Sequence, residues 1–279
     1  MNISFTSRGS TENRQGLAIA QTTWMQYFHS VIGYPMQYVS GLSMLRILSI
    51  CVLALNTICT ALGAEAPTKM HFLGIAGWDE YVFDSELTKA QNIVASAYQI
   101  KSKPVTLNNY ASDKITSLTV KKAFGLVTAD TSLENDVFFL FLTSHGSKER
   151  GFVFKKASPY MHMNPQGLKS FIQAAKMKNV VLVISACFSG QFKGLATDNI
   201  LVITAARSDR TSFGCRPQNE WTYFGRAFFQ EGLSKSRNLY TAFNIAKSSI
   251  SRQEKEEKLL PSEPQIAGGK NLIPLLAKK

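Results

Sequence analysis

Two side chains in this sequence have the chemistry of a nucleophile and a proton carrier, and each follows an apolar run. His145 comes two residues after the run 138–143, and Cys187 directly follows the run 180–186. A thiolate can attack a carbonyl carbon while an imidazole transfers the proton, so this pair is the minimum for nucleophilic acyl transfer. The alternative interpretation is a cysteine that only packs and a histidine held in a loop.

The elements that would position this pair are those of a parallel sheet. Apolar runs alternate with segments of helical spacing from residue 69 onward; the clearest runs are 70–75, 137–142, 180–185 and 200–204, and a further strand is expected at 104–107. Near-continuous apolar runs are typical of parallel strands that helices cover on both faces. Reactive groups collect at the carboxyl ends of such strands. If the strands before His145 and Cys187 are neighbours, the two side chains lie at one edge.

Helical spacing of apolar residues predicts helices over 87–97, 168–175, 221–232 and 239–258. Asn164 and Pro165 are suited to begin the second of these as its cap and its first residue. We expect Arg150–Phe154 to form a short β arm beside the site. His162 falls in a polar segment, 158–164, that predicts a loop, and the apolar run 272–276 predicts a last strand.

The first 64 residues differ from the rest of the chain. The segment 47–64 has no charged residue, Arg46 precedes it, and small residues end it. This order is typical of a signal peptide, with a membrane anchor or a buried helix as alternatives. We therefore expect three parts: an extension over 1–43 upstream of a start at Met44, with Met36 as the alternative start, a signal peptide or anchor over 44–64, and one domain over 65–279. We therefore expect an exported protein that is either periplasmic or anchored in the inner membrane and faces the periplasm.

Composition excludes several classes of protein. The 279 residues are 45% hydrophobic and 18% charged, which is ordinary for a globular protein, and four cysteines are too few for a disulfide scaffold. The net charge of +12 suits anionic surroundings. Because the lysines are scattered, we expect no nucleic-acid partner. Cys215 could pack, pair with Cys187 or bind metal; we expect packing, and neither a metal nor a cofactor.

Several segments, in order along the chain, resemble the legumain-type cysteine peptidases. They are Leu142–Gly146, Val183–Gly190 and Ile203–Cys215, while Trp221–Gly225 and Ser262–Ile266 are particularly similar to bacterial members. The resemblance implies a caspase-like three-layer α/β/α sandwich with a mostly parallel central sheet. It also implies that the protein cleaves polypeptides. It does not indicate an oligomeric state.

Residue by residue, the resemblance assigns His145 as acid and base and Cys187 as nucleophile. The backbone N–H groups of Gly146 and Cys187 would bind the developing oxyanion. Ser212 and Phe213 match residues near the family's primary substrate pocket. Ser185 stands where legumain-like enzymes have an acidic pocket residue, so asparagine specificity is not implied.

Ala76 stands where legumain-like enzymes have an asparagine that supports the histidine, so the resemblance implies a Cys–His pair without a third residue. The leading hypothesis is a cysteine endopeptidase of the bacterial envelope. The alternatives are a transamidase or peptide ligase that uses the same site, and a catalytically silent envelope binding protein.

Overall fold

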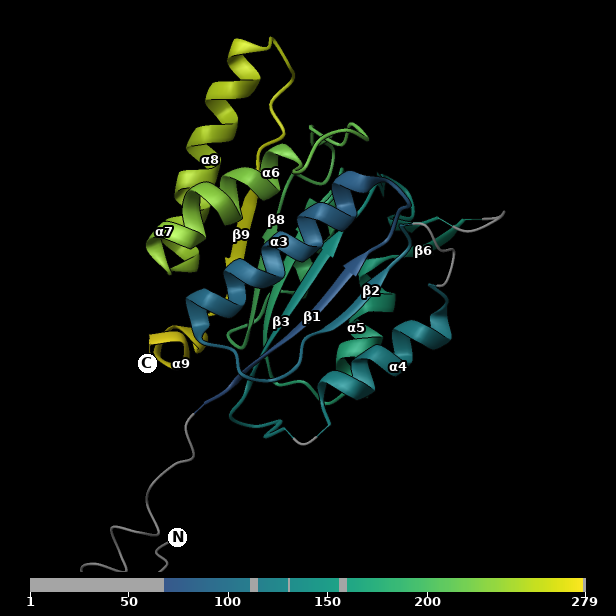
Figure 1. Ribbon diagram of the computed structural model, residues 1–279, viewed down its shortest axis with the longest axis vertical. Helices are drawn as coiled ribbons and strands as arrows, with labels where there is room; N and C mark the ends of the chain where they lie inside the picture. The colour runs from purple at the N-terminus through teal and green to yellow at the C-terminus, as the bar shows by residue number, and fades with distance from the viewer. Residues whose placement is uncertain (1–67, 111–114, 130, 156–159, 278–279) are drawn as a thin grey trace, which may run out of the picture. The chain divides into compact units, whose positions relative to one another are not determined.

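The apolar runs form a six-stranded central sheet in the order β2-β1-β3-β7-β8-β9 (Figure 1). The strands are β1 (Met70–Ala76), β2 (Val105–Asn108), β3 (Val137–Thr143), β7 (Asn179–Ser185), β8 (Ile200–Thr204) and β9 (Gln265–Gly268). The strands from β2 to β8 run parallel, and β9 is antiparallel to β8. Every residue of β1, β3 and β7 is buried, which is why their sequences are almost entirely apolar.

The computed structural model describes residues 68–110, 115–129, 131–155 and 160–277. They lie within the compact unit Pro67–Lys279. The predicted extension over 1–43 and the predicted signal segment over 44–64 fall outside the described residues. Within the described ranges, no helix has the length and apolar character that a membrane crossing requires.

Helices cover both faces of the sheet and complete three layers, as expected. On one face lie α3 (Tyr81–Tyr98), the π-helix η2 (Arg226–Leu233) and α8 (Leu239–Glu256), which share one apolar core with the sheet. On the other face lie α4 (Ser117–Val127) and α5 (Pro165–Ala174), in a second core. Alternate residues of each strand enter the two cores, because side chains point to opposite faces with a period of two.

Polar caps fix where the second-face helices begin. The side chain of Asn164 accepts a hydrogen bond from the N–H of Gly167 at 2.8 Å, and Pro165 is the first residue of α5, which confirms the predicted start. At α4, Thr116 and Thr119 cap each other's backbone N–H groups. We did not predict α4. The shorter helical pieces are η1 (Ser189–Leu195), α6 (Tyr223–Gly225) and α7 (Ser234–Ser236).

The predicted last strand is wrong. Residues Leu272–Ala277 form helix α9, and β9 provides the edge strand instead. A proline breaks the interior of a helix, but Pro274 is the third residue of α9 and so falls in its first turn. There its missing N–H has no partner to lose. The backbone N–H of Leu272 turns back to the carbonyl of Gly269 at 2.9 Å, which begins the helix.

A second, antiparallel sheet lies beside the carboxyl end of β3. It consists of β4 (Gly146–Ser147), β5 (Gly151–Phe154) and β6 (Met161–Met163), so the predicted β arm is part of it. His162 lies in β6 opposite Val153, and the predicted loop is therefore wrong at these positions. The pairing is explained by burial of Met163 with Phe152 and Phe154, which leaves the residues between them on the other face.

One buried side chain ties this sheet to the central one. The amide of Asn109 donates hydrogen bonds to the carbonyls of Gly77 at 2.9 Å and Lys155 at 2.8 Å, and its oxygen accepts from the N–H of Ile115 at 3.0 Å. Asn109 itself is 0% exposed. The loop after β1, the end of β5 and the approach to α4 are thereby held together.

Candidate active site

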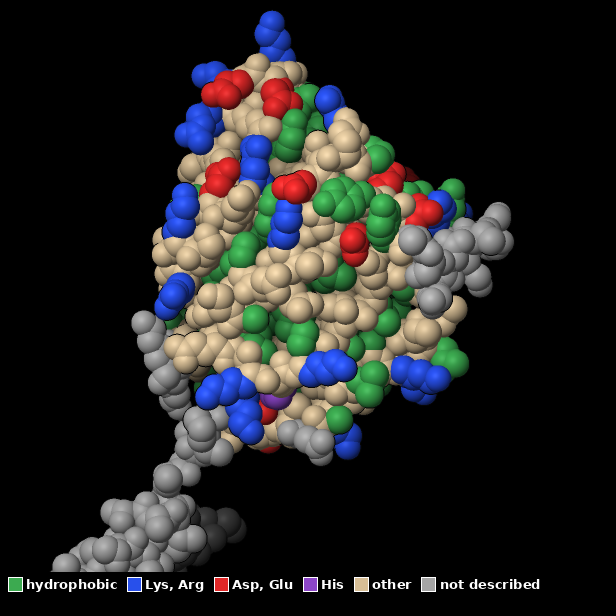
Figure 2. All heavy atoms as spheres, in the orientation of Figure 1, with side chains coloured by type: hydrophobic (Ala, Val, Ile, Leu, Met, Phe, Trp, Pro, Cys, Tyr) green, Lys and Arg blue, Asp and Glu red, His purple; other side chains and the backbone are tan. Residues whose placement is uncertain are grey.

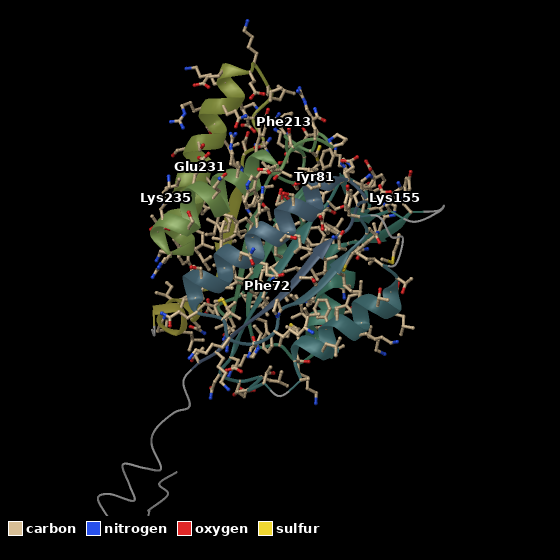
Figure 3. The ribbon with its side chains drawn as sticks, viewed as in Figure 1. Phe72, Tyr81, Lys155, Phe213, Glu231 and Lys235 are labelled. Atoms are coloured by element: carbon tan, nitrogen blue, oxygen red, sulfur yellow. The ribbon has the colours of Figure 1, made fainter. Side chains whose placement is uncertain are left out.

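Strands β3 and β7 are neighbours and deliver His145 and Cys187 to the same edge. Thr143 and Ser185, the last residues of the two strands, lie opposite each other in parallel register. The polypeptide continues for two residues beyond each strand to reach His145 and Cys187, and both side chains line one pocket. The predicted juxtaposition is confirmed. Phe213, another residue of this pocket, is labelled in Figure 3.

Two aromatic rings hold the imidazole of His145. The ring of Trp78 lies 4.9 Å from it, centroid to centroid, at an interplanar angle of 85°, and the ring of Phe83 lies at 5.2 Å and 80°. Edge-to-face contacts of this kind are favourable because the positive edge of one ring meets the negative face of the other. The plane of the imidazole is therefore set before any substrate arrives.

A carboxylate also faces His145. Glu80 Oε1 lies 3.4 Å from His145 Nε2. Glu80 is the residue before α3; its side chain makes no cap hydrogen bond, and its Oε2 is buried without a partner. The structure thus adds a third residue to the predicted pair. Ala76 is buried at the end of β1, and the carboxylate comes from four residues further along the chain.

The thiol of Cys187 contacts the main chain of Ser212. Its Sγ accepts a hydrogen bond from the N–H of Ser212 at 3.3 Å and donates to the carbonyl of Ser212 at 3.4 Å. Burial raises the pKa of the Cys187 thiol above its ordinary value, and the N–H of Ser212 offsets part of that rise. The resting side chain is therefore a thiol at neutral pH, which needs a base before it can attack.

Gly146 lies directly against the backbone of Cys187. A Cβ added at Gly146 would stand 1.9 Å from the carbonyl oxygen of Cys187, so only glycine fits. On the other side of the nucleophile, Phe188 has a φ of 55° and donates its N–H to the carbonyl of Arg210 at 2.8 Å. A left-handed backbone is costly for a residue with a Cβ and is often found at functional sites. The turn that carries Cys187 is thus fixed on both sides.

Comparisons with known proteins agree with this geometry. A model of the peptidase C13 family matches residues 89–267, which is more than half of the chain. The chain belongs to the peptidase C13 family. The structure is also similar to caspase-1 from Spodoptera frugiperda, with a TM-score of 0.52 and 12% identity over 72% of this chain and 86% of that chain. At this identity the likeness shows the fold alone, and no curated protein matches the sequence.

The protein is therefore a legumain-type cysteine peptidase with a caspase-like α/β/α fold. The three residues predicted to line its substrate pocket lie beside the thiol: Ser185, Ser212 and Phe213. The hydroxyls of Ser185 and Thr222 are 3.0 Å apart, so the two hydrogen-bond each other. The other lining residues are Phe83, Ser144, His145, Ala186, Cys187, Cys215 and Thr222.

Cys215 of this C13 peptidase has both a packing contact and a place in the pocket. It is a free, partly buried cysteine that packs against the core on the α3 side. Burial raises the pKa of its thiol, and the neighbouring Cys187 thiol adds to the rise. Among the described residues, no three His, Cys, Asp or Glu side chains come together in a way that could hold a metal ion.

A second acidic residue that the sequence did not single out lies behind the pocket. Glu86, on α3, is 0% exposed, and its Oε2 accepts a hydrogen bond from the N–H of Thr222 at 2.9 Å. Burial raises the pKa of Glu86 above its usual range, although hydrogen bonds from Thr222 and Ser185 oppose the rise. An acidic residue in the first turns of a helix predicts a solvated position, so only the packing of α3 against α6 reveals this one.

The charge of this peptidase is spread rather than concentrated on the visible face. Figure 2 shows the Lys and Arg side chains of the described residues dispersed over that face, with Asp and Glu side chains among them. Some of the charges are paired, as Lys89 and Glu220 are at 2.7 Å. The distribution on this face matches the scattered lysines of the sequence.

Proposed function

We propose that this protein hydrolyses peptide bonds through a thioester on Cys187, with His145 as the proton carrier. The observation that supports the proposal is the delivery of both side chains, from neighbouring parallel strands, into one pocket. Glu80 is the third participant, because its carboxylate lies at His145 Nε2 and can orient the imidazole. The ring nitrogen that Glu80 does not contact is then free to serve the thiol and the substrate.

The reaction proceeds in two steps. His145 takes the proton of the Cys187 thiol, Sγ bonds to the carbonyl carbon, and the N–H groups of Gly146 and Cys187 stabilise the oxyanion. His145 then gives its proton to the leaving nitrogen as the C–N bond breaks, which leaves a thioester. Water attacks the carbonyl carbon of this thioester while His145 accepts a proton from the water. The C–S bond then breaks, and His145 returns the proton to the sulfur of Cys187. An amine in place of water would form a new amide.

The experiment compares wild type with Cys187→Ala and His145→Ala on a peptide library. We expect each substitution to reduce turnover by about 1,000-fold or more, because neither the acyl-enzyme nor its proton transfer can form. Mass spectrometry of rapidly acidified reactions should find the acyl group on the tryptic peptide that contains Cys187. Equal turnover by wild type and Cys187→Ala would refute the proposal.

Two further outcomes separate the alternatives. Products joined to an added amine would identify a transamidase or ligase, whereas hydrolysed ends alone identify a peptidase. A folded protein that neither cleaves the library nor accumulates a thioester would be a silent binding protein, which contradicts the proposal. Gly125→Ala, on α4, serves as the folded control because its added Cβ meets no atom within 4 Å.

We also propose export to a bacterial envelope. Support comes from the sequence alone: Arg46, the uncharged segment 47–64 and the small residues at its end. The test is expression of residues 44–279 in a bacterial host, followed by fractionation and N-terminal sequencing. Export with cleavage gives a periplasmic chain that begins at Glu65, and export without cleavage gives a membrane-bound chain. Recovery of the uncleaved chain in the cytoplasm would contradict the proposal.

A further inference from the structure

The attack of Cys187 decides which substrate residue lies in the pocket. The attacked carbonyl carbon is bonded to the Cα of its own residue, so that residue's side chain lies close to Sγ and faces the pocket walls. We propose that this pocket accepts a small, uncharged side chain, such as that of alanine or serine, from the residue before the scissile bond. The inference rests on the proposed function and names its substrate class.

The first argument is size. The pocket beside Cys187 has a volume of about 10 Å³, which is about the room that one water molecule needs. Phe83 and Phe213 form its apolar walls, and Phe83 is 1% exposed and belongs to the core. A methyl or hydroxymethyl group occupies about as much space as a water molecule. A carboxamide, an isobutyl group or a phenyl ring requires a wall to move.

The second argument is that the walls are fixed. The carbonyl of Phe213 accepts the N–H of Tyr223 at 3.1 Å, and the carbonyl of Gly214 accepts the side-chain amide of Asn219 at 2.8 Å. Thr222, which also lines the pocket, accepts the N–H of Gly225 on its Oγ1 at 2.9 Å and so caps α6. Enlarging the pocket would break such bonds, and a buried donor left without its partner costs roughly 1–3 kcal/mol.

The third argument is charge. Apart from His145, the described residues that line the pocket carry no ionisable side chain except thiols. The hydroxyls of Ser185 and Thr222 offer hydrogen bonds but no counter-ion, and Glu86 lies behind them rather than in the pocket. A carboxylate or an ammonium group would therefore be buried without an opposite charge, which is far more costly than burial of a neutral group.

The test uses peptides that differ only in the residue before the scissile bond: alanine, serine, asparagine, leucine, aspartate and lysine. We expect kcat/KM for alanine and serine to exceed that for asparagine and leucine by about 10-fold or more. For aspartate and lysine the difference should reach about 100-fold. A preference for asparagine, aspartate or lysine would overturn the inference.

Variants of the wall test the size argument directly. Phe213→Ala should raise the leucine-to-alanine ratio of kcat/KM by about 10-fold, because the lost ring makes room for the isobutyl group. Phe213→Leu is the milder variant, to be used if Phe213→Ala fails to give a wild-type melting curve, and should raise the same ratio by a smaller factor. An unchanged ratio in a folded variant would overturn the inference.

Peptidyl chloromethyl ketones with the same six residues separate this inference from the proposed function. They alkylate an active-site thiol without turnover, and mass spectrometry reports the modified cysteine. Alkylation of Cys187 by all six at equal rates would overturn the specificity and leave the nucleophile in place. If no reagent modifies Cys187 and no peptide is cleaved, both the proposed function and this inference fail.

Discussion

Replacing Gly146 by alanine tests the contact between the loop after β3 and the turn after β7. The added Cβ would lie 1.9 Å from the carbonyl oxygen of Cys187, whereas ordinary contact begins at 3.4 Å, so the segments must separate by about 1.5 Å. A displacement of about 1 Å in reacting groups can cost about 100-fold in rate. Loss of one oxyanion donor costs roughly 100- to 1,000-fold in kcat.

We therefore expect Gly146→Ala to lower kcat by about 100- to 1,000-fold with a smaller change in KM, because the walls at Phe213 and Thr222 are untouched. Steady-state kinetics on the best peptide of the library measures both constants. Gly125→Ala is the matched control: it lies in the interior of α4 with open space around its Cβ. It should keep full activity and gain about 0.5–1 kcal/mol of stability. If Gly146→Ala folds and keeps kcat within about threefold of wild type, the contact is not needed for catalysis and the reasoning is wrong.

Three other predictions concern ionisable groups. Glu80→Ala should lower kcat about 10-fold, because His145 loses the group that orients it. Glu80→Gln should retain more activity, because its amide oxygen can accept the same hydrogen bond. Equal rates for both variants would argue against an orienting role. Burial raises the pKa of the Cys187 thiol, so little of it is thiolate near neutral pH. The rate of alkylation by iodoacetamide in the resting enzyme should therefore increase nearly tenfold per pH unit between about pH 6 and pH 8. A rate that does not change with pH would indicate a preformed thiolate. Burial also raises the pKa of Glu86 above its unfolded value, so the native state binds the extra proton and wild-type stability should fall as pH rises from 4.5 towards the raised pKa. Glu86→Gln has no such proton, so its melting temperature relative to wild type should increase over that pH range, by about 2–4 °C for each kcal/mol, and a constant difference would contradict the burial argument.

The sequence alone was sufficient for the framework that places the nucleophile and the histidine. Strands β3 and β7 are long apolar runs, and such runs leave few alternatives to buried parallel strands. Once these strands were expected, the rule that reactive groups collect at carboxyl ends placed His145 and Cys187 together. Local patterns with a direct physical cause could also be predicted from the sequence, as the cap at Asn164 shows.

The two acidic residues of the site could not be predicted, because their roles depend on contacts between distant segments. Glu80 lies 65 residues before His145, and Glu86 lies 136 residues before Thr222. A carboxylate at the start of a helix has an ordinary explanation as a cap or a solvated charge. Only the packing of α3 over the edge of the sheet turns Glu80 towards the imidazole and buries Glu86 behind the pocket.

The hydrogen bonds of Asn109 bear on how the rim of the site moves. One side chain holds the carbonyls of Gly77 and Lys155 and the N–H of Ile115, so no single one of these segments can lift away without straining the other two. Opening the rim then means losing all three bonds together, at about 0.5–1.5 kcal/mol each. Such openings are rare and cooperative, and amide protons around Gly77 and Lys155 should exchange with solvent in step. A substrate thus meets a rim already in its working shape, and recognition depends on fit rather than on closure.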